Sequence, residues 1–393
     1  MPEVSINPRV LVWARKGRNI SESQAADLVG ITESDLTEYE SGKKKPNLTL
    51  LRKIAKKYHY PVVTLFMPEP LPTPPLPRDF RTFEGIRAEL SFDSIITIRD
   101  IQQAHAAIAE LVDDEPQLYH PVGIDSISLS ENISSVTSDQ RKKLSISFVD
   151  QINWSDSQFA FNQFRSVIEN QGIFIYVVRA PLSDFRGFSL FEETGLPGIV
   201  INGRDEHIEP RIFTLFHEYA HILLRNAGMC DEHHNTTNEI ERFCNLFAAE
   251  ILLPEDGLVD LIKSIYGEIP DDWTNVKIRT VANKAKISQQ SFLLRLQELN
   301  LIKEGIYEAW LKQWEEQKVS VSKKQISKGG PDWTVRRMYR LGAKFTGTIL
   351  DALDQGVITR PDVYEFTRVK SEHIEKFREN YFSSISKYER DNQ

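Results

Sequence analysis

At 393 residues the chain is too long for one compact core, and we expect it to fold into two to four domains. A hydrophobic content of 40% and a charged content of 26% are those of an ordinary soluble protein, and the N-terminus lacks the apolar run of a signal peptide. A net charge of −8 gives no global indication of nucleic-acid binding. Two cysteines, Cys230 and Cys244, exclude a disulfide framework, so we expect a cytoplasmic protein without a membrane span.

The N-terminal 68 residues differ in charge from the rest, with 11 Lys/Arg against 7 Asp/Glu. Ser21-x-x-Gln24 is the pattern of a capping box that opens a helix, and Thr32-x-x-Asp35 is a second one. With the closing run YESGKKKP, the segment 10–66 resembles the XRE-type (Cro/repressor-like) helix-turn-helix domain. The resemblance implies an all-α domain over 1–68.

That resemblance also implies a surface for double-stranded DNA. Its recognition helix would present Ser34 and Thr37, among the carboxylates of Glu33, Asp35 and Glu38. The residues expected to hold the phosphate backbone are Arg15, Arg18, Gln24, Lys43, Lys44 and Lys45. Carboxylates facing a phosphate-lined groove weaken DNA affinity, so a domain that binds protein instead remains open.

A proline-rich linker is predicted over 69–82, because six prolines fall within residues 68–77. A helical connecting segment follows over 83–140, in which the Ser/Asp-rich stretch near 121–140 is expected to be loop. The helix that should come next ends at Gly172.

Residues 141–270 are predicted to form a zincin-like α+β domain with a small sheet. Short β-branched and aromatic runs predict strands at 172–178, 187–191 and 198–203. Helices should follow over 212–224 and 239–253, the second stopped by Pro254. Residues 271–393 are expected to be a C-terminal helical region with a helix-turn-helix-like segment at 280–301, so the fold class is α+β, mostly α.

The most informative motif is His217-Glu218-x-x-His221, which lies in an otherwise apolar helical run. Residues four apart share one face of a helix, so both imidazoles can grip one zinc ion. Glu218 then lies close enough to serve as general base toward the water that such an ion activates. The motif therefore predicts a zinc hydrolase.

Zinc in such a site needs a third protein ligand, which the helix after the motif can supply. Glu241 and Asn245 are one turn apart on a stripe beside its apolar face, whereas Glu239 faces elsewhere. We favour Glu241 as the third ligand. Asn245 would orient the carboxylate or an imidazole through a hydrogen bond.

Together, His217-Glu218-x-x-His221-x-x-Leu224 and Glu241-x-x-Cys244-Asn245-x-Phe247-Ala248 resemble the ImmA/IrrE family of zinc metallopeptidases over residues 150–255. That family usually has Ala where this chain has Cys244, and a small thiol can pack there without disturbing the ligands. The resemblance implies an endopeptidase that uses Zn²⁺ and cleaves a transcriptional repressor.

Other readings of these residues stay open. His217 and His221 could be core histidines with Glu218 at the surface. Cys230, His233 and His234 could form a structural zinc site with Cys244, or one of these two histidines could bind a tetrahedral intermediate. The strand at 198–203 could hold an extended substrate by edge pairing.

We therefore expect a regulatory zinc-dependent endopeptidase with a DNA-binding module. Its expected partners are a protein substrate (a repressor or toxin-like regulator) and double-stranded DNA, with a homodimer as an open option and no membrane. The rival from another class is a DNA-binding repressor or antitoxin of a toxin–antitoxin pair, whose metallopeptidase domain is a switch or is inactive. A scaffold that zinc merely stabilises is the third reading.

Overall fold

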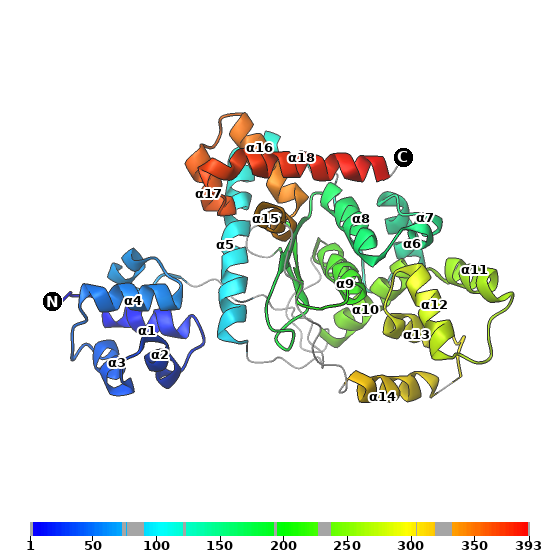
Figure 1. Ribbon diagram of the computed structural model, residues 1–393, viewed down its shortest axis with the longest axis horizontal. Helices are drawn as coiled ribbons and strands as arrows, with labels where there is room; N and C mark the ends of the chain where they lie inside the picture. Colours follow the sequence, from blue (N-terminus) through cyan, green and yellow to red (C-terminus); the bar gives the residue numbers. More distant parts are fainter. Residues whose placement is uncertain are drawn as a thin grey trace. The chain divides into compact units, whose positions relative to one another are not determined.

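The computed structural model describes residues 3–72, 76, 90–120, 123–191, 195–226, 237–303, 305–318 and 332–391 (Figure 1). It is 65% helix with one small mixed sheet, which confirms the predicted mostly helical α+β class. The described residues fall into two compact units, one within 1–78, 82–103 and 180–185, the other within 79–81, 104–179 and 186–393. Each unit is described by itself.

The first unit contains the predicted helix-turn-helix. Its helices are α1 (Pro8–Lys16), α2 (Glu22–Val29), α3 (Glu33–Glu40), α4 (Leu48–Tyr58) and the 3-10 turn η1 (Val62–Phe66). Ser21 and Gln24 form the predicted capping box at the start of α2, and the Thr32 hydroxyl caps α3 by accepting from the Asp35 N–H. Buried apolar residues from α1, α2 and α4, such as Val10, Val29 and Leu51, close the core between the helices.

The long helix α5 (Phe92–Asp114) is shared between the two units. The helices that follow before the sheet are η2 (Pro116–Leu118), α6 (Ile133–Lys143), α7 (Phe148–Asn153) and α8 (Ser157–Asn170). Gly172, with φ of +98°, ends the α8 segment in the left-handed region that glycine adopts without strain. This is the predicted end of that helix.

The sheet of the second unit has three strands in the order β1-β3-β2: β1 (Phe174–Val178), β2 (Gly187–Leu190) and β3 (Gly198–Asn202). Strand β3 is central, parallel to β1 and antiparallel to β2. All residues of the three strands are buried, as expected for a sheet covered on both faces. His105 of α5 lies on one face, where its ring nitrogens bond to the Tyr176 hydroxyl (3.1 Å) and the Leu196 carbonyl (2.9 Å).

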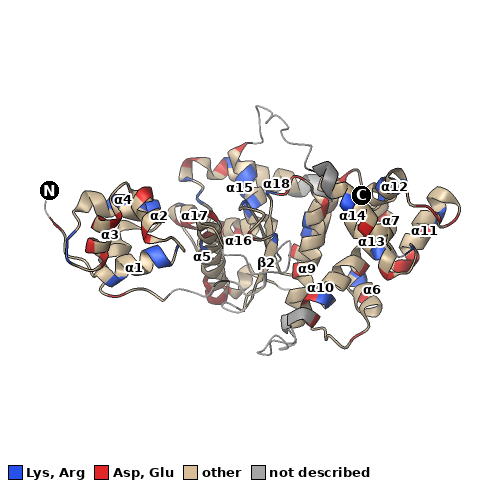
Figure 2. Cartoon of the chain, turned by 90° about the horizontal axis from the view of Figure 1, so that it is seen from below, with Lys and Arg blue, Asp and Glu red and all other residues tan. Residues whose placement is uncertain are grey.

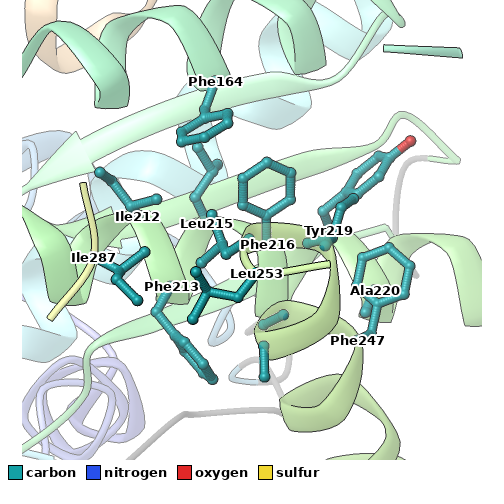
Figure 3. Close-up of a cluster of buried hydrophobic side chains, with 14 of the residues drawn as sticks. Phe164, Ile212, Phe213, Leu215, Phe216, Tyr219, Ala220, Phe247, Leu253 and Ile287 are labelled. Carbon is teal, nitrogen blue, oxygen red and sulfur yellow. The ribbon is translucent and has the colours of Figure 1, made fainter. Parts of the chain in front are cut away.

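Helix α9 (Glu209–Asn226) packs against β2 and β3 and beside α10 (Thr237–Leu252). Apolar side chains lie on nearly every side of α9, so the helix is embedded in the core rather than laid on it (Figure 3). Phe216 illustrates this, because its ring meets that of Phe164 edge to face at 4.9 Å between centroids. Burial of a phenylalanine side chain of this kind stabilises the fold by about 1.5–3 kcal/mol.

The prediction of a loop over 121–140 holds for residues 123–132 but is wrong for residues 133–140, because α6 occupies Ile133–Lys143. Its sequence, ISSVTSDQRKK, has few apolar residues and therefore shows no amphipathic stripe. Polar side chains hold it to the core instead: Tyr219 donates to Gln140 (2.7 Å) and Arg141 donates to the Ile251 carbonyl (2.6 Å). The short helix α7 was likewise not predicted.

The remaining helices begin after Pro254, which stops α10 as predicted. They are α11 (Glu255–Tyr266), α12 (Asn275–Ala285), α13 (Gln289–Glu298), α14 (Ile306–Lys318), α15 (Trp333–Leu341), α16 (Ala343–Asp354), α17 (Arg360–Thr367), the 3-10 turn η3 (Ser371–His373) and α18 (Ile374–Asp391). Ser288 caps α13, as predicted for the helix-turn-helix-like segment. Among the described residues, every helix is too short or too polar to cross a membrane.

Candidate metal centre

Helices α9 and α10 bring together the three predicted ligands, His217, His221 and Glu241. The two histidines are buried and lie one turn apart on α9, while Glu241 approaches from α10 with its side chain 38% exposed. One donor atom from each of the three lies within 4.8 Å of the other two. The site is thus buried on the α9 side and accessible on the side of the carboxylate.

The donor atoms have the spacing that zinc requires. The two Nε2 atoms are 3.2 Å apart, and each lies 3.3 Å from one oxygen of Glu241. Four-coordinate zinc, with bonds near 2.0–2.1 Å, places its ligand atoms roughly 3.3 Å apart. The two imidazoles and the carboxylate, which meets His217 through Oε2 and His221 through Oε1, are therefore close enough to hold one zinc ion together.

Asn245 stands behind His217. Its Oδ1 is 3.1 Å from the Nδ1 of His217, so with the Nδ1–H tautomer the imidazole donates to Asn245 and turns the Nε2 lone pair toward Glu241. Asn245 is one turn along α10 from Glu241, as the sequence predicted. It contacts an imidazole, one of the two groups that we expected it to orient.

Cys244 holds a position that the sequence did not reveal. The thiol is buried and hydrogen-bonds the imidazole of His221, yet it does not belong to the group of converging donor atoms. It therefore contacts His221 from outside that group, much as Asn245 contacts His217. The sequence clue to this contact was the position of Cys244 on α10, next to Asn245 and three residues after Glu241.

The electrostatics of the cluster favour a cation. Burial by itself would lower the pKa of His221, but Cys244, Glu241 and Glu218 raise it well above its usual value. Burial would raise the pKa of the Glu241 carboxyl, yet hydrogen bonds from His217 and His221 hold it well below its usual range. These groups therefore stabilise a positive charge between them, and a divalent metal ion would supply that charge.

Glu218 is buried on α9 beside both histidines and lies under strand β2. The close approach of β2 requires Gly187. A Cβ at this position would lie 2.5 Å from the Thr214 side chain and 3.4 Å from the Cγ of Glu218. The glycine therefore lets the strand run directly over the part of α9 that carries Glu218.

The expectation that the strand at 198–203 could hold a substrate by edge pairing is wrong. Strand β3 is hydrogen-bonded to β1 on one side and to β2 on the other, so both of its edges are used. Among the described residues, β2 pairs with β3 alone, and it is the strand that passes over Glu218. The edge strand of the site is β2.

Three residues of the alternative readings, Cys230, His233 and His234, lie outside the described residues. The alternative in which Glu218 is at the surface disagrees with the structure, since this residue is 1% exposed.

In the helix-turn-helix domain, two arginines that were expected to contact DNA phosphates are buried in the interior instead. Arg15 is 6% exposed and forms an ion pair with Glu40 (2.8 Å). Arg18 is 5% exposed and donates to the carbonyls of Tyr58 (2.7 Å) and His59 (2.8 Å). A sequence pattern could not separate these arginines from surface ones.

The other predicted DNA contacts are exposed, namely Gln24, Ser34, Thr37, Lys43, Lys44 and Lys45. Lys44 forms an ion pair with Asp35 (2.6 Å), and the Gln24 side chain is bonded to the Ser21 N–H of the capping box. Acidic residues are prominent on α3, including Glu33 and Asp35 in its first turn (Figure 2).

Comparison with known families agrees with this geometry. Residues 168–297 match the family of the IrrE N-terminal-like domain, peptidase family M78, a region that runs past the boundary predicted at 270. Residues 11–65 match a helix-turn-helix family. A search of curated proteins found no match. The chain therefore carries an IrrE N-terminal-like domain of peptidase family M78 together with an N-terminal helix-turn-helix DNA-binding domain of the XRE type.

Proposed function

We propose that the chain is a regulatory zinc-dependent endopeptidase that cleaves a DNA-bound or DNA-regulating protein. The observation that carries this proposal is the convergence of His217, His221 and Glu241, whose Nε2 atoms lie 3.2 Å apart and each 3.3 Å from a Glu241 oxygen. Glu218 lies beside them on the same helix. The M78 family match agrees with a peptidase and leaves the substrate open.

In this proposal His217, His221 and Glu241 hold the zinc ion, and Asn245 keeps His217 in the tautomer that can bind it. Zinc in such a site would polarise the scissile carbonyl and lower the pKa of water. Two neutral imidazoles and one carboxylate are the ligand set of several hydrolytic zinc enzymes. The donor chemistry therefore fits both the metal and the reaction.

Glu218 would act as general base and then as general acid. Its carboxylate accepts the proton of the attacking water and delivers it to the amine that leaves when the peptide bond breaks. Glu218 is buried on the same helix as both histidines, which places it beside the site.

The central test replaces Glu218 by Gln. Glu218→Gln should bind one equivalent of zinc, measured by elemental mass spectrometry, and should lose peptidase activity by a factor of about 100 or more. Glu239→Gln, an exposed carboxylate on α10, is the matched control and should keep both. Retained cleavage by Glu218→Gln would remove the general-base assignment, and unchanged zinc content in His221→Ala would remove the metal site.

The substrate can be sought with the same variant. Proteins that co-purify with Glu218→Gln from its own cells would be incubated with the wild-type protein, and the products read by mass spectrometry. Cleavage by the wild type alone supports the peptidase. A partner that co-purifies in stoichiometric amount and is cleaved by neither Glu218→Gln nor the wild type would favour the antitoxin function.

The helix-turn-helix domain would bring the peptidase to its operator or to a DNA-bound substrate. Ser34 and Thr37 on α3 would face bases, while Lys43, Lys45 and Gln24 would lie near phosphates. Its DNA affinity, measured by fluorescence anisotropy, should fall as salt rises. Binding that is absent or insensitive to salt would indicate a protein-binding domain.

A further inference from the structure

The C-terminal helices of the second unit carry a group of arginines that lies outside both matched regions, 11–65 and 168–297. Helix α15 has three arginines and no acidic residue (Figure 2). The sequence around it is strongly basic, since residues 318–344 hold eight Lys/Arg against one Asp in a chain of net charge −8. A local excess of positive charge in an acidic protein points to an anionic partner.

The arginines of α15 lie on a side of the helix that faces away from the core. The helix packs against β1 and α18, and Thr334 and Leu341 are its buried residues. Trp333, Arg336 and Arg340 are exposed, and their spacing of three and four residues aligns them along one side of the helix. That side therefore presents an indole ring and two guanidinium groups to solvent.

The end of α17 adds two more cations beside this side of α15. The Arg337 Nε donates to the Thr367 carbonyl at 2.6 Å, which brings α15 next to the residue before Arg368. Arg368 and Lys370 are exposed. The Cζ of Arg368 lies 5.9 Å from the centroid of the Tyr364 ring, a side chain that is 43% exposed. We define the basic surface as Trp333, Arg336, Arg340, Tyr364, Arg368 and Lys370.

The cations of the basic surface are not neutralised by carboxylates, unlike other cations of the same helices. Three ion pairs neutralise those others, namely Arg360–Glu375, Lys376–Asp332 and Arg378–Asp354. Within the part of the chain that the structure describes, the four cations of the basic surface form no ion pair. A guanidinium group without a carboxylate partner can bind two oxygens of one phosphate.

The N-terminal domain gives a reason for phosphate contacts elsewhere in the chain. Arg15 and Arg18 are buried there, and Glu33 and Glu38 are exposed on α3. The domain thus offers few cations to duplex DNA, although affinity for DNA depends strongly on the number of phosphates that a protein neutralises. Further phosphate contacts would raise the affinity of the whole chain.

We propose that the basic surface binds the phosphate backbone of duplex DNA without reading its sequence. Arg336, Arg340 and Arg368 would bond to phosphate oxygens, while the rings of Trp333 and Tyr364 would pack against sugars. This contact is additional to any operator that α3 reads, and it does not depend on the peptidase activity.

The main test measures binding of a fluorescent duplex of random sequence to the full, zinc-loaded chain by anisotropy, at several salt concentrations. Arg336→Gln/Arg340→Gln should lower the affinity about tenfold or more and reduce the salt slope by about two, since each phosphate contact contributes about 0.9. The control Arg360→Gln/Lys376→Gln removes the same charge from exposed ion pairs and should leave the slope unchanged. An unchanged slope in the first variant, or an equal loss in the control, would overturn the proposal.

Competition distinguishes duplex DNA from other anionic partners. Neither a single strand of the same length nor polyglutamate at equal charge concentration should displace the duplex as well as unlabelled duplex does. A single strand that binds more tightly would overturn the duplex assignment in favour of single-stranded nucleic acid. More effective displacement by polyglutamate would overturn it in favour of an acidic protein segment.

Two further measurements locate the contact. In the complex with the duplex, Arg336 and Arg340 should be protected from phenylglyoxal, whereas Arg360 should react as in the free protein; the reverse pattern would contradict the site. Lys43→Ala tests the N-terminal domain separately. If Lys43→Ala leaves the slope unchanged and Arg336→Gln/Arg340→Gln reduces it, the basic surface stands and the DNA surface of the N-terminal domain fails.

Discussion

Two segments of this chain form the same helix–turn–helix backbone but use their second helix differently. Between α2 and α3, Gly30 takes a left-handed conformation with φ of +72°, and the N–H of Ile31 bonds to the Ala26 carbonyl at 3.0 Å. Thr32 then caps α3.

Between α12 and α13 the corresponding residues repeat this turn. Lys286 has φ of +62°, the N–H of Ile287 bonds to the Ala282 carbonyl at 3.1 Å, and Ser288 caps α13.

The difference lies in what surrounds the second helix. On α3, Ser34 and Thr37 are exposed. On α13, Arg295 is 6% exposed, donates to the Leu253 carbonyl at 3.1 Å and pairs with Glu250 of α10. The same local motif therefore presents a surface in one unit and supports helix α10 in the other.

The largest effect should come from Arg295→Met, which leaves the carboxylate of Glu250 buried without its cation. Breaking a buried ion pair in this way destabilises a domain by about 3–5 kcal/mol. The double variant Arg295→Met/Glu250→Met should recover most of that loss, and Ser34→Ala on α3 should stay within about 0.5 kcal/mol. Urea denaturation measures all three, and a small loss in Arg295→Met would show that α13 is not a support.

The next largest losses of stability should come from substitutions at the isoleucine of each turn. Ile287 is 2% exposed and packs in the core of the second unit, so Ile287→Ala should destabilise that unit by about 2–5 kcal/mol. Ile31 is half-buried, and Ile31→Ala should have a smaller effect. Equal losses, measured by thermal unfolding of each variant, would mean that the two turns are equally buried in solution.

A smaller effect is expected at Gly30, where the left-handed backbone favours glycine. Gly30→Ala should destabilise the N-terminal unit by about 1 kcal/mol, because it places a Cβ in that conformation. Gly30→Asn should lose less, since asparagine tolerates positive φ better than other side chains. If scanning calorimetry found Gly30→Asn to be less stable than Gly30→Ala, the turn geometry would be contradicted.

The smallest effects on stability should come from two polar residues, the exposed Lys43 and the half-buried Gln289, and their effects on DNA binding should distinguish the two helix–turn–helix segments. Lys43→Ala should leave unfolding unchanged and reduce the salt slope of DNA binding by about one. Gln289→Ala on α13 should alter neither DNA affinity nor its slope. A loss of DNA binding in Gln289→Ala would instead assign α13 to the DNA surface.

Much of the site could be predicted because its signals are local. The spacing of His217 and His221 and that of Glu241 and Asn245 depend only on the period of a helix. The caps at Ser21, Thr32 and Ser288 are local as well. Groups at helical spacing share a face whatever surrounds them.

The predictions failed where contacts between residues distant in sequence determine the local structure or the burial of a side chain. Helix α6 lacks an amphipathic pattern, and Gln140 and Arg141 anchor it through partners that are distant in sequence. Arg15 and Arg18 resemble surface cations until the fold buries them. Cys244 seemed a mere packing residue, since its contact with His221 depends on how α10 docks against α9.

Helical periodicity, caps and turn residues are properties of a few neighbouring residues, and they sufficed to find both helix–turn–helix segments and the three converging donors. Burial depends on which distant segments cover a surface. The tertiary structure alone therefore decided that α3 is exposed while α13 is a support, and that β2 rather than β3 is the edge strand beside Glu218.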